Sequence, residues 1–186
     1  MKQIDARNLT GMFLIAVPSL KDPNFEQTVV LICDHTKDGA FGIVINRILL
    51  NSFIPLLGGL DIKECVKDIP VFYGGPVKPE QGYILYTSSK NYQPSIKINN
   101  KLILTTSKEI LVDIAADKGP EKFLFALGFA GWAPGQLEHE LMTDSWLVAP
   151  AINKIIFDNP VNERWKAAAD SIGVDITRLF QRQGMV

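Results

Sequence analysis

A cysteine and a histidine lie two residues apart in this sequence. Cys33 ends an apolar, β-branched run, and Asp34 and His35 follow it before the Asp-Gly of a predicted turn. A thiol acts as a nucleophile at neutral pH only where a positive partner lowers its pKa. Residues two apart in an extended chain point to the same face, so His35 could be that partner. One hypothesis is therefore a thiol-dependent enzyme or redox sensor that uses Cys33.

The structural interpretation of the same residues is simpler, and we favour it. An apolar run that ends in cysteine is typical of a buried strand, in which the thiol packs as a small hydrophobic group. Asp34 and His35 would then shape the hairpin turn. We expect Cys33 to be a buried core thiol.

A metal site would have to join Cys33 and His35 to a third ligand, such as His139 or a glutamate beside it. Zinc needs three or four ligands within tetrahedral reach, and nothing in the spacing brings the segment around His139 to the hairpin. Cys33 and Cys65 also lack the paired spacing of a structural zinc site. We expect no metal and no other cofactor.

Five further residues stand at predicted strand ends, turns or helix starts. Asn46 ends a strand, and Gly74 and Gly75 precede a proline in a turn. Trp132 and Gln136 lie where a helix is predicted to begin. Fixed polar groups and free helix amides at such places can hold an anion or a peptide. In the alternative interpretation, Trp132 packs in the core and the two amide side chains tie loops together.

We combine these positions into one predicted ligand groove. Its residues are Cys33, His35, Asn46, Gly74, Gly75, Trp132 and Gln136. We expect a structure to show whether they converge on one exposed cleft or are scattered. Scattered positions would leave them with a role in folding only.

The charge composition argues against a nucleic-acid-binding surface. Lys and Arg number 19 against 20 Asp and Glu, for a formal net charge of -1, so no overall field attracts phosphate. The segment 87–122 has six lysines against four acidic residues, and the helix predicted after Pro134 has three acidic residues and no Lys or Arg. Direct nucleic-acid binding therefore has weak support. The expected partner is an unidentified ligand or protein.

Membrane insertion and export are not expected from the sequence. The uncharged stretches are shorter than the roughly 20 apolar residues of a membrane span. The apolar run 12–17 has six residues, fewer than the roughly 7–15 of a signal peptide core. Two cysteines do not make a framework of several disulfides. We expect a cytoplasmic protein with no membrane partner.

The order of the predicted elements indicates the fold class. Two apolar runs at 28–33 and 41–46 have a short connection, which favours an antiparallel hairpin. The other strands are predicted at 13–17, 71–73, 82–87, 95–98, 102–105, 123–129, 146–148 and 154–157. Helices are predicted after a capping box at 106–109, in which Thr106 would accept the Glu109 amide, after Pro134, and after Asn159-Pro160 as the last element. Clustered strands followed by helices predict an α+β fold in one domain, 1–186, with a mixed or antiparallel sheet.

Several ordered blocks of the sequence resemble the YqgE/AlgH family of bacterial proteins, over residues 10–177. They include Phe13–Pro18, Asp22–Phe25, Cys33–His35, Gly39–Asn46, Gly74–Val77, Leu127–Trp132, Trp146–Pro150 and Arg164–Ala168. The resemblance implies a flattened, barrel-like sheet that carries helices concentrated in the C-terminal half. It brings no catalytic residues. One branch of the family is described as a regulator of exopolysaccharide transcription, so a transcriptional regulator is implied as well.

Three positions depart from the family pattern. Ile48 stands where proline is usual, Tyr86 where histidine is common, and Ile152 where aspartate is often found. No metal or acid–base role can rest on the missing histidine or aspartate. The favoured prediction is a non-enzymatic, cytoplasmic binding or regulatory protein, with the Cys33 enzyme or redox sensor as the alternative.

Overall fold

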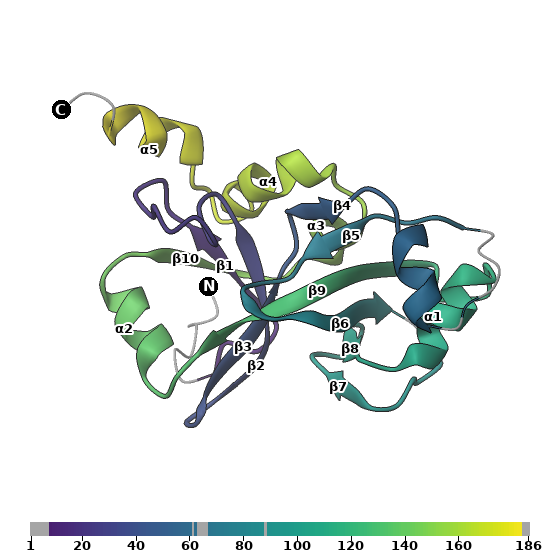
Figure 1. The fold of residues 1–186 in the computed structure, drawn as a ribbon. Coiled ribbons are helices and arrows are strands. Elements are labelled where there is room, and N and C mark those ends of the chain that lie inside the picture. The colour runs from purple at the N-terminus through teal and green to yellow at the C-terminus, as the bar shows by residue number, and fades with distance from the viewer. Residues whose placement is uncertain (1–7, 61, 63–66, 88, 184–186) are drawn as a thin grey trace.

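The computed structural model describes residues 8–60, 62, 67–87 and 89–183. Ten strands within these residues form one curled sheet, which wraps into a half-barrel (Figure 1). The strands are β1 (Met12–Ala16), β2 (Val29–Thr36), β3 (Gly39–Val44), β4 (Ile48–Leu50), β5 (Val71–Tyr73), β6 (Val77–Thr87), β7 (Ser95–Lys97), β8 (Ile103–Thr105), β9 (Lys122–Trp132) and β10 (Trp146–Pro150).

The sheet is mixed, as predicted. Its main path runs β10-β1-β2-β3-β9-β6-β8-β7, and β5 lies beside β9 with β4 on its outer side. All pairings along the main path are antiparallel, whereas β5 runs parallel to β9. The predicted hairpin is confirmed as β2 and β3.

The α-helices of the described residues all lie in the C-terminal half, which confirms the α+β class. Two short 3-10 helices, η1 (Ile54–Leu60) and η2 (Val161–Glu163), accompany them. The α-helices are α1 (Lys108–Ala115), α2 (Gln136–Met142), α3 (Asn153–Phe157), α4 (Arg164–Asp170) and α5 (Ile176–Gln183). In Figure 1, α2 lies at one end of the sheet, α1 and η1 lie at the other, and α3 and α4 lie above the centre.

Three predicted elements were wrong in detail. The strand predicted at 154–157 is helix α3, in which Ile155 and Ile156 are buried; so short an apolar run has no period that separates a strand from a buried helix. Ser107, not Thr106, caps α1, because its hydroxyl accepts the Glu109 amide at 3.3 Å. Helix α5 follows α4, which had been predicted as the last helix.

The buried side chains form three clusters, which we name after the helices that cover them. The α4-side core includes Ile155, Ile156, Ala168 and Ala169 together with Phe13, Val29, Leu31, Leu85 and Leu124. The α2-side core includes Leu137 with Leu9, Val30, Ile32, Ala40 and Trp132, and the α1-side core includes Ile110, Leu111 and Ile114 with Ile84 and Phe125. Strand β9 contributes to all three, so it links the two ends of the molecule.

A buried arginine fastens α4 to the sheet. Arg164 is 5% exposed, and its Nη1 donates to the Ile45 carbonyl at 2.6 Å while its Nε donates to the Asn159 carbonyl at 3.1 Å. Its guanidinium also lies over the Phe72 ring, at 5.2 Å from the centroid. Burial lowers the pKa of Arg164 to about 10, so the group is still charged at neutral pH. One side chain thus joins α4 to the preceding loop, to the end of β3 and to β5.

Replacing Arg164 should destabilise the fold. We expect Arg164→Ala to lower the free energy of unfolding in urea by about 2–3 kcal/mol, since it leaves a buried carbonyl without a donor and removes packing from Phe72. The matched control is Arg178→Ala, because the Arg178 side chain is 84% exposed and such changes cost within about 0.5 kcal/mol. Equal unfolding midpoints for the two variants would contradict the role assigned to Arg164.

Candidate functional site

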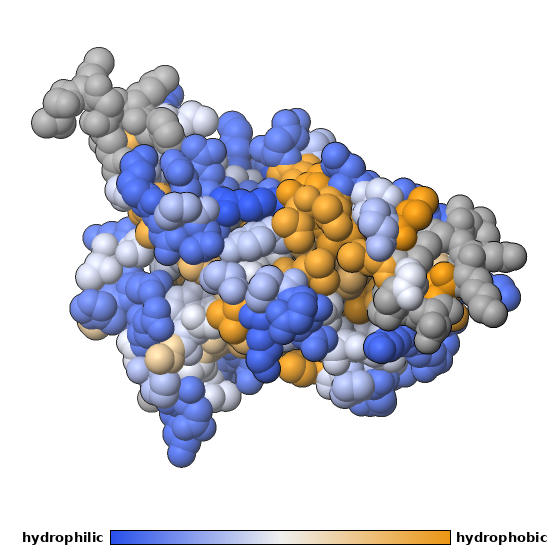
Figure 2. Space-filling model, viewed as in Figure 1, coloured by the Kyte–Doolittle hydropathy of each residue, from blue (hydrophilic) through white to orange (hydrophobic). Residues whose placement is uncertain are grey.

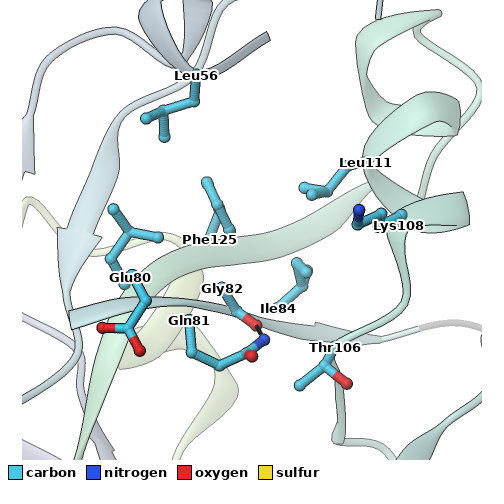
Figure 3. Close-up of a pocket in the computed structure, with 10 residues that line it drawn as sticks. Leu56, Glu80, Gln81, Gly82, Ile84, Thr106, Lys108, Leu111 and Phe125 are labelled. Atoms are coloured by element: carbon cyan, nitrogen blue, oxygen red, sulfur yellow. Dashed lines mark hydrogen bonds between the residues drawn. The ribbon is translucent and has the colours of Figure 1, made fainter. Parts of the chain in front are cut away.

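A cleft of about 450 Å³ opens between η1 and α1, with β6 and β9 as its floor (Figure 3). This volume falls within the roughly 300–1,000 Å³ of small-molecule sites. Its walls are largely apolar. The lining residues are Leu56, Glu80, Gln81, Gly82, Ile84, Thr106, Lys108, Leu111, Phe125 and Leu127.

Strand alternation separates the η1–α1 cleft from the α4-side core. Directly opposed residues of antiparallel strands point to the same face of a sheet. The pairs Gly82↔Leu127 and Ile84↔Phe125 line the cleft. The intervening pairs, Tyr83↔Ala126 and Leu85↔Leu124, belong to the α4-side core. The two strands therefore carry the α4-side core on one face and, on the other, the residues of the α1-side core that line the cleft.

A missing side chain at Gly82 keeps the floor of the cleft open. A Cβ atom at this position would lie 2.9 Å from the Phe125 ring. The Phe125 ring is held in place by an edge-to-face contact with Phe53, whose centroid lies 5.4 Å away. Gly82 thus leaves room for an aromatic ring that forms part of the cleft wall.

The polar groups of the cleft lie on opposite sides of it. Lys108 and Thr106 stand at the start of α1, Glu80 stands across the floor on β6, and Gln81 of β6 lies between Glu80 and Thr106 in Figure 3. Among the residues that the structure describes, the Lys108 ammonium and the Thr106 hydroxyl have no ion pair or hydrogen bond. Gln81 donates to the Gly82 carbonyl at 3.1 Å. The cleft therefore offers a positive group and a hydroxyl on one side and a carboxylate on the other.

An exposed apolar surface adjoins the cleft. Ile48, Leu49, Leu50 and Ile54 are between 37% and 53% exposed. They lie on β4, which pairs with β5 along one edge, and at the start of η1. Figure 2 shows the apolar area over this part of the molecule. Since η1 also supplies Leu56 to the cleft, the apolar surface continues from β4 to the cavity.

Cys33 and His35 point to opposite faces of the sheet, which corrects the prediction that they share one. The register of β2 and β3 shifts between Ile32 and Asp34, so Cys33 is the extra residue of a bulge. The thiol lies in the α4-side core. His35 pairs with Ala40 of the α2-side core. A bulge inverts the alternation of side chains, so the imidazole does not face the thiol.

The Cys33 thiol is fully buried, as predicted. Burial raises its pKa, which disfavours the thiolate that a nucleophile or redox sensor requires. Its sulfur lies 3.5 Å from the Leu31 carbonyl. A thiol-dependent activity at Cys33 is therefore not favoured. Cys65 lies outside the described residues.

His35 is a strand residue, not a turn residue as predicted, and its ring has two partners. Its Nδ1 accepts the Leu9 amide at 3.1 Å, and its Nε2 lies 3.0 Å from Glu138 Oε1 on α2. The neutral ring must therefore carry its hydrogen on Nε2. This histidine connects the N-terminal segment, the hairpin and α2.

Trp132 and Gln136 converge on one carboxylate, that of Glu140. Glu140 Oε2 accepts the indole N–H groups of Trp132 and Trp146 at 2.9 and 2.8 Å, and its Oε1 accepts Gln136 Nε2 at 2.9 Å. Phe25 stacks on Trp132 at 6.2 Å. The sequence analysis did not select Glu140, because in the sequence it is only one of several acidic residues of a helix.

Asn46 links the segment that follows β3 to the start of β2. Its Oδ1 accepts the Val29 amide at 2.8 Å, and its Nδ2 donates to the Gln27 carbonyl at 2.9 Å. Gly74 and Gly75 are buried against β9, where their Cβ atoms would lie 2.2 Å from the Gly128 carbonyl oxygen and 2.1 Å from the Phe129 carbonyl carbon. Gly75 also has a φ of +151°. Each of these residues has a structural contact that accounts for its type.

The predicted groove and the η1–α1 cleft share no residue. Cys33, His35, Asn46, Gly74, Gly75, Trp132 and Gln136 are absent from the cleft lining. A ligand-binding role for these seven residues stays a prediction. The cleft residues were missed because Ile84, Phe125 and Leu127 are indistinguishable from core residues in a sequence. Among the cleft residues, only Gly82 gave a signal in the sequence, because a glycine inside a predicted strand often marks a bulge or a close approach of a ligand or another backbone.

Neither a metal-ligand cluster nor a membrane-spanning helix occurs in the part of the chain that the structure describes. No three His, Cys, Asp or Glu residues gather there as a metal site would require. Every helix there is too short or too polar to cross a lipid bilayer. Every buried side-chain nitrogen and oxygen there has a hydrogen-bond partner. The η1–α1 cleft is therefore the feature on which we base the function.

Comparisons with known proteins define the class. A UPF0301 protein of Methylococcus capsulatus is 46% identical over 183 residues, covering 97% of both chains. A UPF0301 protein of Nitrosococcus oceani is 44% identical and covers 90% of this chain and 91% of its own. These relatives place the chain among the bacterial UPF0301 proteins.

The chain belongs to the AlgH-like family, whose model matches residues 13–177. The solution structure of the AlgH protein from Pseudomonas aeruginosa has a TM-score of 0.80 and 41% identity, with 96% of both chains covered. A crystal structure from Corynebacterium diphtheriae, at 19% identity and a TM-score of 0.75, covers 96% of this chain and 94% of its own and shows the same fold. The resemblance found in the sequence is confirmed. None of these names states an activity.

The close backbone approach at Gly75 gives a test of its structural role. We expect Gly75→Ala to lower the free energy of unfolding by about 3 kcal/mol or more, since the new Cβ would overlap the Phe129 carbonyl at a positive φ. Urea titration monitored by circular dichroism measures the change. The matched control is Gly58→Ala in η1, where a Cβ would meet nothing within 4 Å. A wild-type midpoint for Gly75→Ala would show that the approach is not required.

The burial of Cys33 predicts a protected thiol. Iodoacetamide should modify Cys33 in the native protein at least roughly 100-fold more slowly than in urea, because the buried group is inaccessible and stays protonated. Peptide mass spectrometry separates Cys33 from Cys65, and the unfolded chain is the control. Native modification at the rate of a free cysteine would restore the thiol hypothesis.

Proposed function

We propose that this chain is a cytoplasmic, non-enzymatic binding protein that takes an apolar ligand into the η1–α1 cleft. The observation that carries the proposal is a cavity of about 450 Å³ with apolar walls and few polar groups, which is the usual composition of a small-molecule site. The adjoining apolar surface on β4 supports an approach of such a ligand along this side of the molecule.

The residues around the cleft support binding rather than catalysis. Neither cysteine nor histidine occurs among the lining residues, and the Thr106 hydroxyl has no base hydrogen-bonded to it within the described chain. An activated hydroxyl nucleophile needs such a base. The lining side chains can therefore hold and orient a molecule, and none of them forms a nucleophile–base pair.

A regulatory role is compatible with the position of the cleft. Its walls come from η1, from α1 and from the β6–β9 floor, so a ligand would contact segments that lie far apart in the sequence. Binding would then stabilise one arrangement of η1 and α1 through its differential affinity. We propose that regulation, including regulation of transcription, would act through this binding event and would not require contact with DNA.

The neutral dye Nile red tests the proposed cleft. We expect the dye to fluoresce on binding, and Leu56→Ser to weaken its binding about tenfold, since the variant removes apolar area from the cleft wall. Leu49→Ser is the matched control, because Leu49 is exposed on β4 outside the cleft. Loss of dye binding in Leu49→Ser with normal binding in Leu56→Ser would place the dye on the surface and overturn the proposal.

A further inference from the structure

We infer that the ligand of the η1–α1 cleft is an amphipathic monocarboxylate: a free, straight-chain acid whose alkyl chain lies on the apolar floor and whose carboxylate is bound by Lys108 and Thr106. This inference rests on the proposed function and adds the chemical class of the ligand. It depends on three features of the cleft, which are its polar start at α1, its apolar length and the carboxylate on its far side.

The polar end at α1 is suited to an anion. Lys108 is exposed and Thr106 half-buried at the cleft, and neither side chain has an ion pair or hydrogen bond among the described residues. Lys90, which also lies beside α1, differs in this respect, because it is paired with Asp113 and Glu109. An ammonium and a hydroxyl together can give a carboxylate charge-assisted hydrogen bonds. The free lysine of the cleft is therefore available to a ligand.

The apolar part of the cleft is suited to an alkyl chain. Ile84, Leu111 and Phe125 are each at most 5% exposed, although they line the cavity. Together with Leu56 and Leu127 they make the lining of the cavity largely apolar. Each methylene group that enters such a surface contributes about 0.8 kcal/mol, which corresponds to roughly fourfold in affinity. Affinity should rise with chain length until the cavity is filled.

The far side of the cleft is unsuited to a second negative charge. Glu80 lies across the floor from Lys108 (Figure 3) and has no ion pair among the described residues. A linear acid bound at Lys108 extends toward this carboxylate. A chain that ends in a methyl group is compatible with that position, whereas a terminal carboxylate would be repelled. The cleft should therefore prefer monocarboxylates to dicarboxylates.

Isothermal titration of the full chain with octanoate, decanoate, decanedioate and 1-octanol tests the inference. We expect decanoate to bind about 15-fold more tightly than octanoate, because it buries two more methylene groups. Octanoate should bind more tightly than its neutral analogue 1-octanol. Lys108→Gln should weaken the binding of octanoate about tenfold and leave the affinity for 1-octanol unchanged. Glu80→Gln should raise the affinity for decanedioate and leave the affinity for decanoate unchanged.

A second lysine provides the control for general charge effects. Lys101 is exposed in the turn before β8 and does not line the cleft, so Lys101→Gln should bind octanoate as the wild type does. Equal losses in Lys101→Gln and Lys108→Gln would overturn the inference. Octanoate that binds no more tightly than 1-octanol would also overturn it. In both cases Nile red and 1-octanol would still bind, whereas failure of the proposed function would abolish their binding too.

Discussion

A close approach of backbones at the centre of the sheet is the constraint on which the rest of the structure depends. Gly74 donates its amide to the Leu127 carbonyl at 2.8 Å and accepts the Val44 amide at 2.9 Å, so one residue bridges β9 and β3. There is no room for a side chain where the backbones approach, since a Cβ on Gly128 would lie 2.3 Å from the Gly75 carbonyl oxygen. The glycines allow β5 to run parallel to β9 within an otherwise antiparallel sheet.

The central position of β9 explains how one strand serves both stability and binding. Its Leu124 and Ala126 lie in the α4-side core, and its Phe125 and Leu127 face the η1–α1 cleft. The same hydrophobic alternation that builds the core therefore builds the apolar floor of the cavity. Helices α1 and η1 border that floor, and the cavity of about 450 Å³ lies between them.

The residues that the sequence analysis selected as candidates for catalysis or binding form structural contacts. His35 joins Leu9 to Glu138, and Glu140 binds the indoles of Trp132 and Trp146. Polar groups in a low-dielectric interior must be hydrogen-bonded, so such residues are restricted in type whether or not they bind a ligand. The proposed site lies elsewhere, where Lys108 and Thr106 have no partner in the described chain.

The local sequence pattern was sufficient to predict the family, the α+β class, the β2–β3 hairpin and the burial of Cys33, because these depend on composition, periodicity and turn residues. The tertiary structure alone decided that a bulge turns Cys33 and His35 to opposite faces, that residues 154–157 are helical, and that Leu56, Lys108 and Phe125 border one cavity. Register shifts and contacts between distant segments depend on long-range packing, which no short window of a sequence contains.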